Sequence, residues 1–265
     1  MRQHSVWDAL ILSFYSKPLY HDVAAHWRGT GFAYLLLLLA LCWVPEMAKL
    51  QVGMTKWVRG EGTQIVKQIP PIDIKDGEVS TGVTTPYFIK DPEKGNVIAI
   101  IDLTGQYTSL ENSPANMLLT KHAFYTRNSA SEVRSYDLKN VKSFHLDQTR
   151  VQGWLNLAGS WLVVVLYPFA LLFSFIYRIA QALIYGLCGL VISRVVKVQL
   201  EYLTLLRLAA VAVTPAVILE TVRSVGSVHI PYWSLLCFLI AMGYLYFAVT
   251  ATVAPEASAP AQPIA

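Results

Sequence analysis

The histidine and carboxylate side chains of this chain are the first candidates for chemistry, because their spacing decides whether they can share a metal or a proton. His21 and His26 are five residues apart, which matches no metal-binding helix motif. Asp73, Asp76 and Glu78 lie close together but lack the ligand spacing of a calcium loop. No serine lies in the Gly-x-Ser-x-Gly arrangement of a hydrolase nucleophile. We therefore predict no catalytic residue, no metal site and no cofactor, and we expect a protein that is not an enzyme.

Asp102, Thr104 and Gly105 form the candidate site of the polar part of the chain, since they follow its most apolar predicted strand, 97–103. A carboxylate at the end of such a strand is either a buried acid at a binding site or the cap of a turn. The turn cap is the more common of these two arrangements.

The apolar stretch 200–220 contains Arg207 and Pro215. An arginine that faces lipid costs roughly 2.5–3.5 kcal/mol on insertion scales, so Arg207 should contact other helices, reach a lipid phosphate or line a wet cavity. Pro215 removes a helix donor and releases the carbonyl of Val211, which predicts a bend. In the simpler alternative, Arg207 only reaches the membrane interface from a helix end, and Pro215 is only a tolerated kink. The candidate lipid or packing site comprises Arg207, Pro215, Arg178 and Glu201.

Composition indicates a membrane protein, because 54% of the 265 residues are apolar and only 14% are charged. The formal net charge of +4 is scattered along the chain, and without a basic block we expect no nucleic-acid partner. Cys42, Cys188 and Cys237 all fall in predicted membrane spans, so they supply neither disulfides nor a zinc site to the polar region.

The predicted fold is an α-helical bundle of about five transmembrane helices with an inserted extracytoplasmic α+β domain, mostly antiparallel sheet. A span needs about 20 apolar residues. The first span is 31–46, and the nearly forty apolar residues from Trp154, interrupted chiefly by Arg178, are predicted as two helices. The four spans after the polar region, within 154–250, are 155–176, 179–195, 200–220 and 230–250. A four-span alternative makes part of this run re-entrant and reverses the last helices. The tail 251–265 is predicted to be disordered.

Residues 1–30 are predicted to form two amphipathic helices. Trp7 and Ile11 lie on the apolar face of the first, and Leu19 and Val23 on that of the second. These helices either lie in the membrane interface or pack against the bundle as ordinary protein. Positive charges before the first span favour a cytoplasmic N-terminus, which places residues 47–153 outside the cytoplasm.

The polar region 47–153 is predicted to begin with a helix and to continue as short strands. Asp76-Gly77 is typical of a tight hairpin turn with positive φ, and 91–95 is a second turn signal. The predicted strands are 72–74, 79–81, 87–89, 97–103, 117–119, 123–126, 133–138 and 141–144.

Four segments of the chain carry a family resemblance: SFYSKPLYHDVAAHWRGTGFAYLLLL, IPPIDIKDGEVSTGVTTPYFI, VIAIIDLTG and LLRLAAVAVTPAVIL. Together they resemble the bacterial family known as domain of unknown function 1189, whose membrane part is similar to the Yip-like group of five-span proteins. The resemblance implies five spans and an extracytoplasmic domain. It implies no catalytic residues.

These observations favour a non-enzymatic protein of the bacterial inner membrane, whose outer domain binds an envelope partner or forms part of a membrane complex. The alternative is lipid or amphiphile binding or translocation by the helix with Arg207 and Pro215. A small-molecule transporter ranks last, because only one broken helix and no inverted repeat are evident. The expected partners are membrane lipids and a membrane or envelope protein, while the oligomeric state is not predicted.

Overall fold

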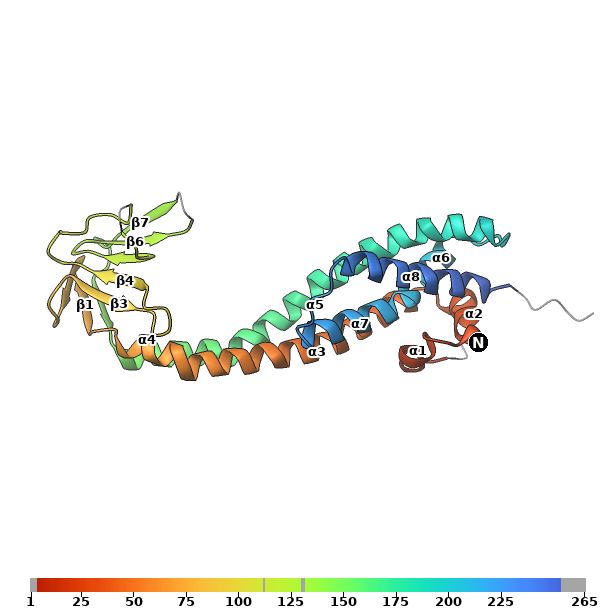
Figure 1. The fold of residues 1–265 in the computed structure, drawn as a ribbon, viewed down its shortest axis with the longest axis horizontal. Helices are drawn as coiled ribbons and strands as arrows, with labels where there is room; N and C mark the ends of the chain where they lie inside the picture. The colour runs from red at the N-terminus through yellow and green to blue at the C-terminus, as the bar shows by residue number, and fades with distance from the viewer. Residues whose placement is uncertain (1–3, 112, 130–131, 254–265) are drawn as a thin grey trace, which may run out of the picture. The chain divides into compact units, whose positions relative to one another are not determined.

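The computed structural model describes residues 4–111, 113–129 and 132–253, and these residues divide into two compact units (Figure 1). The first, here called the helical unit, contains the described residues up to Leu50 and from Val164 onward. The second, the sheet unit, contains Gln51–Val163. The long helix α3, Thr30–Trp57, leaves the helical unit, and the longer helix α5, Gln148–Val195, returns to it.

Among the described residues, four helical segments are long and apolar enough to cross a membrane. They are α3, α5, the pair α6 (Tyr202–Ala212) and α7 (Thr214–Val225), and α8, Trp233–Thr250. The prediction of a helical membrane protein with an inserted, mostly antiparallel sheet domain is confirmed at this level.

The prediction of two helices within 155–195 is wrong, because α5 is one continuous helix of 48 residues. At about 1.5 Å per residue its length is about 72 Å, more than twice the hydrocarbon thickness of a bilayer. The prediction assumed that each span is about 20 residues long, but the first third of α5 belongs to the sheet unit. Arg178 does not interrupt the helix, since arginine has a high helix propensity.

The helix that contains the predicted first span, 31–46, is longer than that span. α3 continues through Pro45 and Glu46 to Trp57. A proline inside a helix removes one backbone donor and bends the helix without necessarily ending it.

The bend predicted at Pro215 is confirmed as the break between α6 and α7. Pro215 lies in the first turn of α7, where its missing N–H costs nothing. The carbonyl of Val211, which the proline deprives of its helical donor, accepts a 2.6 Å hydrogen bond from Thr214 Oγ1 instead. Thr214 is fully buried, and its hydroxyl is also 2.7 Å from the hydroxyl of Tyr34 on α3.

The two amphipathic helices expected in residues 1–30 are α1, Val6–Leu12, and α2, Lys17–His26. α2 packs against α6 and α8, and Leu19 and Val23 are fully buried, so this helix is part of the core. On α1, Trp7 and Ile11 are more than half exposed, so an interfacial position stays a prediction for α1 alone.

The sheet unit begins with the C-terminal end of α3, a π-helical turn at Val58–Gly62 and the short helix α4, Thr63–Lys67. One sheet has the antiparallel order β2-β1-β8, and the other has the order β3-β4-β5-β6-β7 with only β4 and β5 parallel. The strands are β1 Ile72–Lys75, β2 Glu78–Thr81, β3 Tyr87–Lys90, β4 Val97–Ile101, β5 Met117–Leu119, β6 Ala123–Arg127, β7 Val133–Asp137 and β8 Ser143–Leu146.

The two sheets share one apolar core, to which Ile72 and Ile74 contribute from the smaller sheet and Ile89 and Ile101 from the larger. The predicted hairpin turn is confirmed, since Asp76 and Gly77 have φ of 49° and 82° between β1 and β2. The disorder predicted for 251–265 lies, from residue 254 onward, outside the described residues.

Candidate functional site

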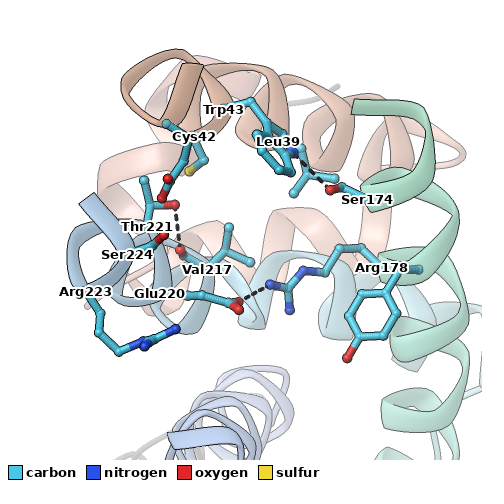
Figure 2. A pocket seen from close by; sticks show the side chains of 12 residues that line it. Leu39, Cys42, Trp43, Ser174, Arg178, Val217, Glu220, Thr221, Arg223 and Ser224 are labelled. Carbon is cyan, nitrogen blue, oxygen red and sulfur yellow. Dashed lines mark hydrogen bonds and ion pairs between the residues drawn. The ribbon is translucent and has the colours of Figure 1, made fainter. Parts of the chain in front are cut away.

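A cavity of about 280 Å³ lies inside the helical unit, between α3, α5 and α7. Leu39 and Val217 supply apolar wall, and Arg178 and Glu220 supply opposite charges (Figure 2). The complete lining is Leu39, Cys42, Trp43, Glu46, Ser174, Tyr177, Arg178, Val217, Glu220, Thr221, Arg223 and Ser224. The cavity thus combines apolar walls in the bundle with charges of both signs.

An ion pair between Arg178 on α5 and Glu220 on α7 crosses the cavity (Figure 2). The arginine side chain is only 12% exposed, whereas that of Glu220 is 44% exposed. Gln181 Oε1 accepts a second bond from Arg178 Nη1 at 2.6 Å, and the guanidinium carbon lies 5.6 Å from the ring centre of Tyr177. An arginine so enclosed needs an opposite charge, because its burial without one is costly. Glu220 therefore neutralises the charge that α5 carries into the bundle.

Side-chain bonds hold α3 and α5 together beside the cavity. Trp43 Nε1 donates to Ser174 Oγ at 2.9 Å, and Tyr167 donates its hydroxyl hydrogen to the Ala40 carbonyl at 3.0 Å. These two bonds link the α3 and α5 sides of the cavity wall directly.

Two charged groups of the lining keep unused hydrogen-bonding capacity. Glu46 is half-buried, and its carboxylate has no hydrogen-bond or ion-pair partner among the described residues. Arg223 Nε is buried and likewise lacks a partner in the described part of the chain, although Nη1 reaches the Val228 carbonyl at 3.3 Å. The Arg223 guanidinium carbon lies 5.1 Å from the ring centre of Trp233. The cavity therefore offers one carboxylate and one guanidinium N–H that a ligand could satisfy.

The four residues of the predicted lipid or packing site do not come together. Arg178 lines the cavity, whereas Arg207 donates to the Ala24 carbonyl at 3.2 Å and to Thr204 Oγ1 at 3.0 Å. Ala24 lies in the last turn of α2, where a cation stabilises the free carbonyls. Arg207 thus joins α6 to α2, which corresponds to the packing alternative. Pro215 is buried at the α6–α7 break, and Glu201 is an exposed residue just before α6.

A model of the family described as "Protein of unknown function (DUF1189)" matches residues 7–249. The chain belongs to this family. No curated protein and no solved structure matches it.

In this DUF1189 chain, Asp102 stabilises a turn of the sheet unit. Its side chain is 1% exposed, and it accepts bonds from the Thr104 amide at 2.8 Å, the Thr104 hydroxyl at 2.6 Å and the Tyr107 amide at 2.6 Å. Burial acts to raise the pKa of Asp102, but the bonds from Thr104, Tyr107 and Gln106 outweigh it and leave the pKa below its usual range. Gly105 has a φ of 85° in the same turn. The three candidate residues thus come together in one turn, which Asp102 caps. The turn cap is one of the two alternatives that the sequence left open.

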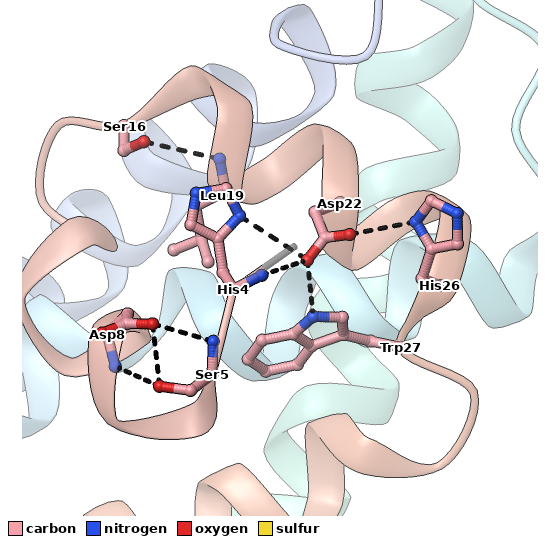
Figure 3. Close-up of polar contacts among 8 residues, drawn as sticks. All are labelled: His4, Ser5, Asp8, Ser16, Leu19, Asp22, His26 and Trp27. Atoms are coloured by element: carbon pink, nitrogen blue, oxygen red, sulfur yellow. Dashed lines mark hydrogen bonds and ion pairs between the residues drawn. The ribbon is translucent and has the colours of Figure 1, made fainter. Parts of the chain in front are cut away.

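A second polar cluster, around Asp22 of α2, is enclosed in the helical unit (Figure 3). Its carboxylate is 2.9 Å from His26 Nδ1, and it accepts bonds from the His4 amide at 3.1 Å and Trp27 Nε1 at 3.3 Å. Asp22 is 2% exposed and Trp27 is fully buried. These bonds fix the segment before α1 and the end of α2 to each other, so the cluster has a structural role.

The chemistry available in the cavity of the DUF1189 chain is recognition of charge. Its lining contains hydroxyl groups, one thiol, two carboxylates and two guanidinium groups, but no histidine. Among the described residues no group of three or more histidine, cysteine or carboxylate side chains could hold a metal ion.

Sequence reasoning missed Glu220, Glu46 and Arg223 as site residues. The signal that points to Glu220 is present in the sequence, since Arg178 interrupts an apolar run and requires an acid, and Glu220 ends the predicted span 200–220. Which acid pairs with which arginine follows only from the positions of α5 and α7 on either side of the cavity.

Proposed function

We propose that this protein is a non-enzymatic, multi-pass membrane protein that binds the charged headgroup of an amphiphile in the cavity between α3, α5 and α7. The observation that supports this most strongly is the Arg178–Glu220 ion pair, which borders a space instead of being closed by packing. Charged groups inside membrane helices are rare and generally functional.

The surroundings of the cavity suit an amphiphile better than a small polar solute. On α5, Phe173, Ile176 and Tyr177 are each more than half exposed in the described structure. They lie just before Arg178 on the same helix, so an acyl chain can lie on them while the headgroup enters the cavity. A volume near 280 Å³ is slightly below the roughly 300–1,000 Å³ of sites for drug-sized ligands, which fits a headgroup and not a whole lipid.

We propose a topology of four crossings with both ends of the helical unit in the cytoplasm of a bacterial inner membrane. Four crossings place Arg194 and Lys197, which lie between α5 and α6, on the same side as Lys17 and Arg28. Five crossings would place Arg194 and Lys197 outside, against the positive-inside rule. In this topology residues 51–163 are extracytoplasmic, and the cavity, bordered by the last turns of α7, lies in the outer half of the membrane.

The test is lipid retention by the full chain, purified in mild detergent and measured by native mass spectrometry. The double variant Arg178→Gln, Glu220→Gln removes both charges without leaving one unpaired in the bundle. It should lower lipid retention about tenfold, the effect of losing a charged hydrogen bond. The variant Arg194→Gln, an exposed arginine on the same helix outside the cavity, serves as the matched control and should retain lipid like wild type. Equal retention by all three proteins would refute the proposed site.

A second candidate function, the binding of an envelope protein by the sheet unit, rests on the edge strand β7. This strand pairs only with β6 among the described strands, and four of its five residues are exposed. Exposed backbone groups on such an edge can pair with an extended segment of another protein. Co-purification under mild detergent tests this function, and recovery of a lone monomer would count against it.

A further inference from the structure

The cavity of the helical unit contains equal numbers of opposite charges. Its lining holds the guanidinium groups of Arg178 and Arg223 and the carboxylates of Glu46 and Glu220. A purely anionic headgroup would meet two carboxylates in this small space, and a purely cationic one would meet two guanidinium groups. A ligand that carries both charges matches the lining.

The unused hydrogen-bonding groups define where each charge of such a ligand would bind. Glu46, which has no partner among the described residues, is the free acceptor, and the Oε1 atom of Glu220 is not bonded within the described part of the chain. On the cationic side, Arg223 Nε is buried without a partner, and Arg178 uses Nη1 and Nη2 once each, which leaves further donors.

Resting on the proposed function, we propose that the ligand of this cavity is a zwitterionic phosphate with a primary ammonium group, the chemistry of a phosphoethanolamine headgroup. Its phosphate binds Arg178 and Arg223, because a guanidinium donates two parallel hydrogen bonds to phosphate oxygens. Its ammonium binds Glu46 and Glu220 as a hydrogen-bond donor. A quaternary ammonium has no N–H to donate, so a phosphocholine headgroup satisfies the phosphate half of the site alone.

The experiment is a competition among short-chain lipids for the purified full chain, measured by native mass spectrometry. Dihexanoyl phosphatidylethanolamine, phosphatidylglycerol and phosphatidylcholine are offered together at equal concentration. The wild-type protein should bind phosphatidylethanolamine about tenfold more tightly than the other two, as expected for charge-assisted hydrogen bonds in a partly enclosed site. This comparison needs no variant, so it holds even if a substitution impairs folding.

The variant Glu46→Gln should abolish the preference for phosphatidylethanolamine, because it removes one of the two carboxylates that bind the ammonium and that repel an anionic headgroup. Glu46 has no partner among the described residues, so its replacement breaks no hydrogen bond or ion pair in that part of the chain. The variant Glu201→Gln, another acid of the helical unit, serves as the control because it lies outside the cavity and should keep the preference. Soluble phosphoethanolamine, added as a competitor, shows whether the headgroup alone suffices or the acyl chains are also needed.

The outcomes separate the two proposals. One outcome is equal binding of all three lipids that is unaltered by Glu46→Gln but lost in the Arg178→Gln, Glu220→Gln variant. It would contradict the proposal of a zwitterionic ligand and support the proposed amphiphile site. Tighter binding of phosphatidylglycerol than of phosphatidylethanolamine would likewise contradict the proposal of a zwitterionic ligand. Both proposals are overturned if lipid binding does not depend on Arg178 and Glu220. Preference for phosphatidylethanolamine that disappears in Glu46→Gln supports both.

Discussion

Replacing Gly77 by alanine should destabilise the sheet unit by about 3 kcal/mol. Gly77 has a φ of 82°, and the left-handed conformation costs an alanine roughly 1–2 kcal/mol. In addition, a Cβ atom at Gly77 would lie 2.8 Å from the Cα atom of Lys139 and 3.2 Å from the Leu138 carbonyl oxygen. These are backbone atoms, so the neighbouring chain must move, and the amide bond from Gly77 to the Val141 carbonyl, 3.0 Å long, is weakened with it.

Hydrogen exchange of the full chain in detergent measures this effect, because it reports the opening of the two sheets separately from that of the bundle. In Gly77→Ala the protected amides of β1, β2 and β8 should exchange about a hundredfold faster. Gly82→Ala is the control, since Gly82 lies just after β2 and a Cβ atom there would have no atom within 4 Å. If both variants exchange alike, Gly77 is not a conformational requirement of the turn.

Replacing Asp22 by alanine should destabilise the helical unit by about 3 kcal/mol. The carboxylate is 2% exposed, and its removal leaves the indole N–H of the fully buried Trp27 and the amide of His4 without that acceptor. Buried donors that lose their partner contribute their full desolvation cost. Thermal unfolding of the full chain in detergent, followed by tryptophan fluorescence, should show a lower midpoint for Asp22→Ala.

Two further variants locate the cause of that loss. Asp22→Asn keeps an acceptor oxygen and should lose less stability than Asp22→Ala. Asp8→Ala removes an exposed acid that closes the capping box of α1 with Ser5, and it should cost only about 1 kcal/mol. If Asp8→Ala and Asp22→Ala unfold at the same temperature, the cluster around Asp22 does not fix the N-terminal segment.

The strands could be predicted from the sequence because their signals are local. Alternating apolar residues predict β1, and a continuous apolar run predicts β4. Asp76-Gly77 predicts the turn that sets the register of β1 and β2. The break at Pro215 is local in the same sense, since the proline itself removes the helical bond to Val211. The pairing of β1 with β8, across seventy residues of chain, carries no comparable signal.

The continuity of α3 and α5 could not be predicted from segment length. A length rule treats every 20 apolar residues as one span, but α5 continues from the sheet unit into the helical unit without a helix-breaking residue near 178. Pro45 in α3 was compatible with a helix end or a bend, and only packing of the following turns decides between them.

The candidate site depends on long-range contacts, so only one of its charged residues, Arg178, was predicted. Arg178 and Glu220 are 42 residues apart, and their contact depends on how α5 and α7 pack. Arg207 has the same sequence character as Arg178, an arginine in an apolar helix, yet it bonds the end of α2. Residue type alone does not distinguish an arginine that joins two helices from one that borders a cavity.

Photolabelling with a phosphatidylethanolamine analogue that carries its reactive group on the head tests the central claim most directly. The full chain is labelled in lipid nanodiscs, and the modified peptides are identified by mass spectrometry. The cavity site predicts labels concentrated in 39–46, 174–178 and 217–224, with a severalfold decrease in the Arg178→Gln, Glu220→Gln variant. Labels spread evenly along the exposed apolar residues of α5, with the same intensity in that variant, would contradict a headgroup site in the bundle.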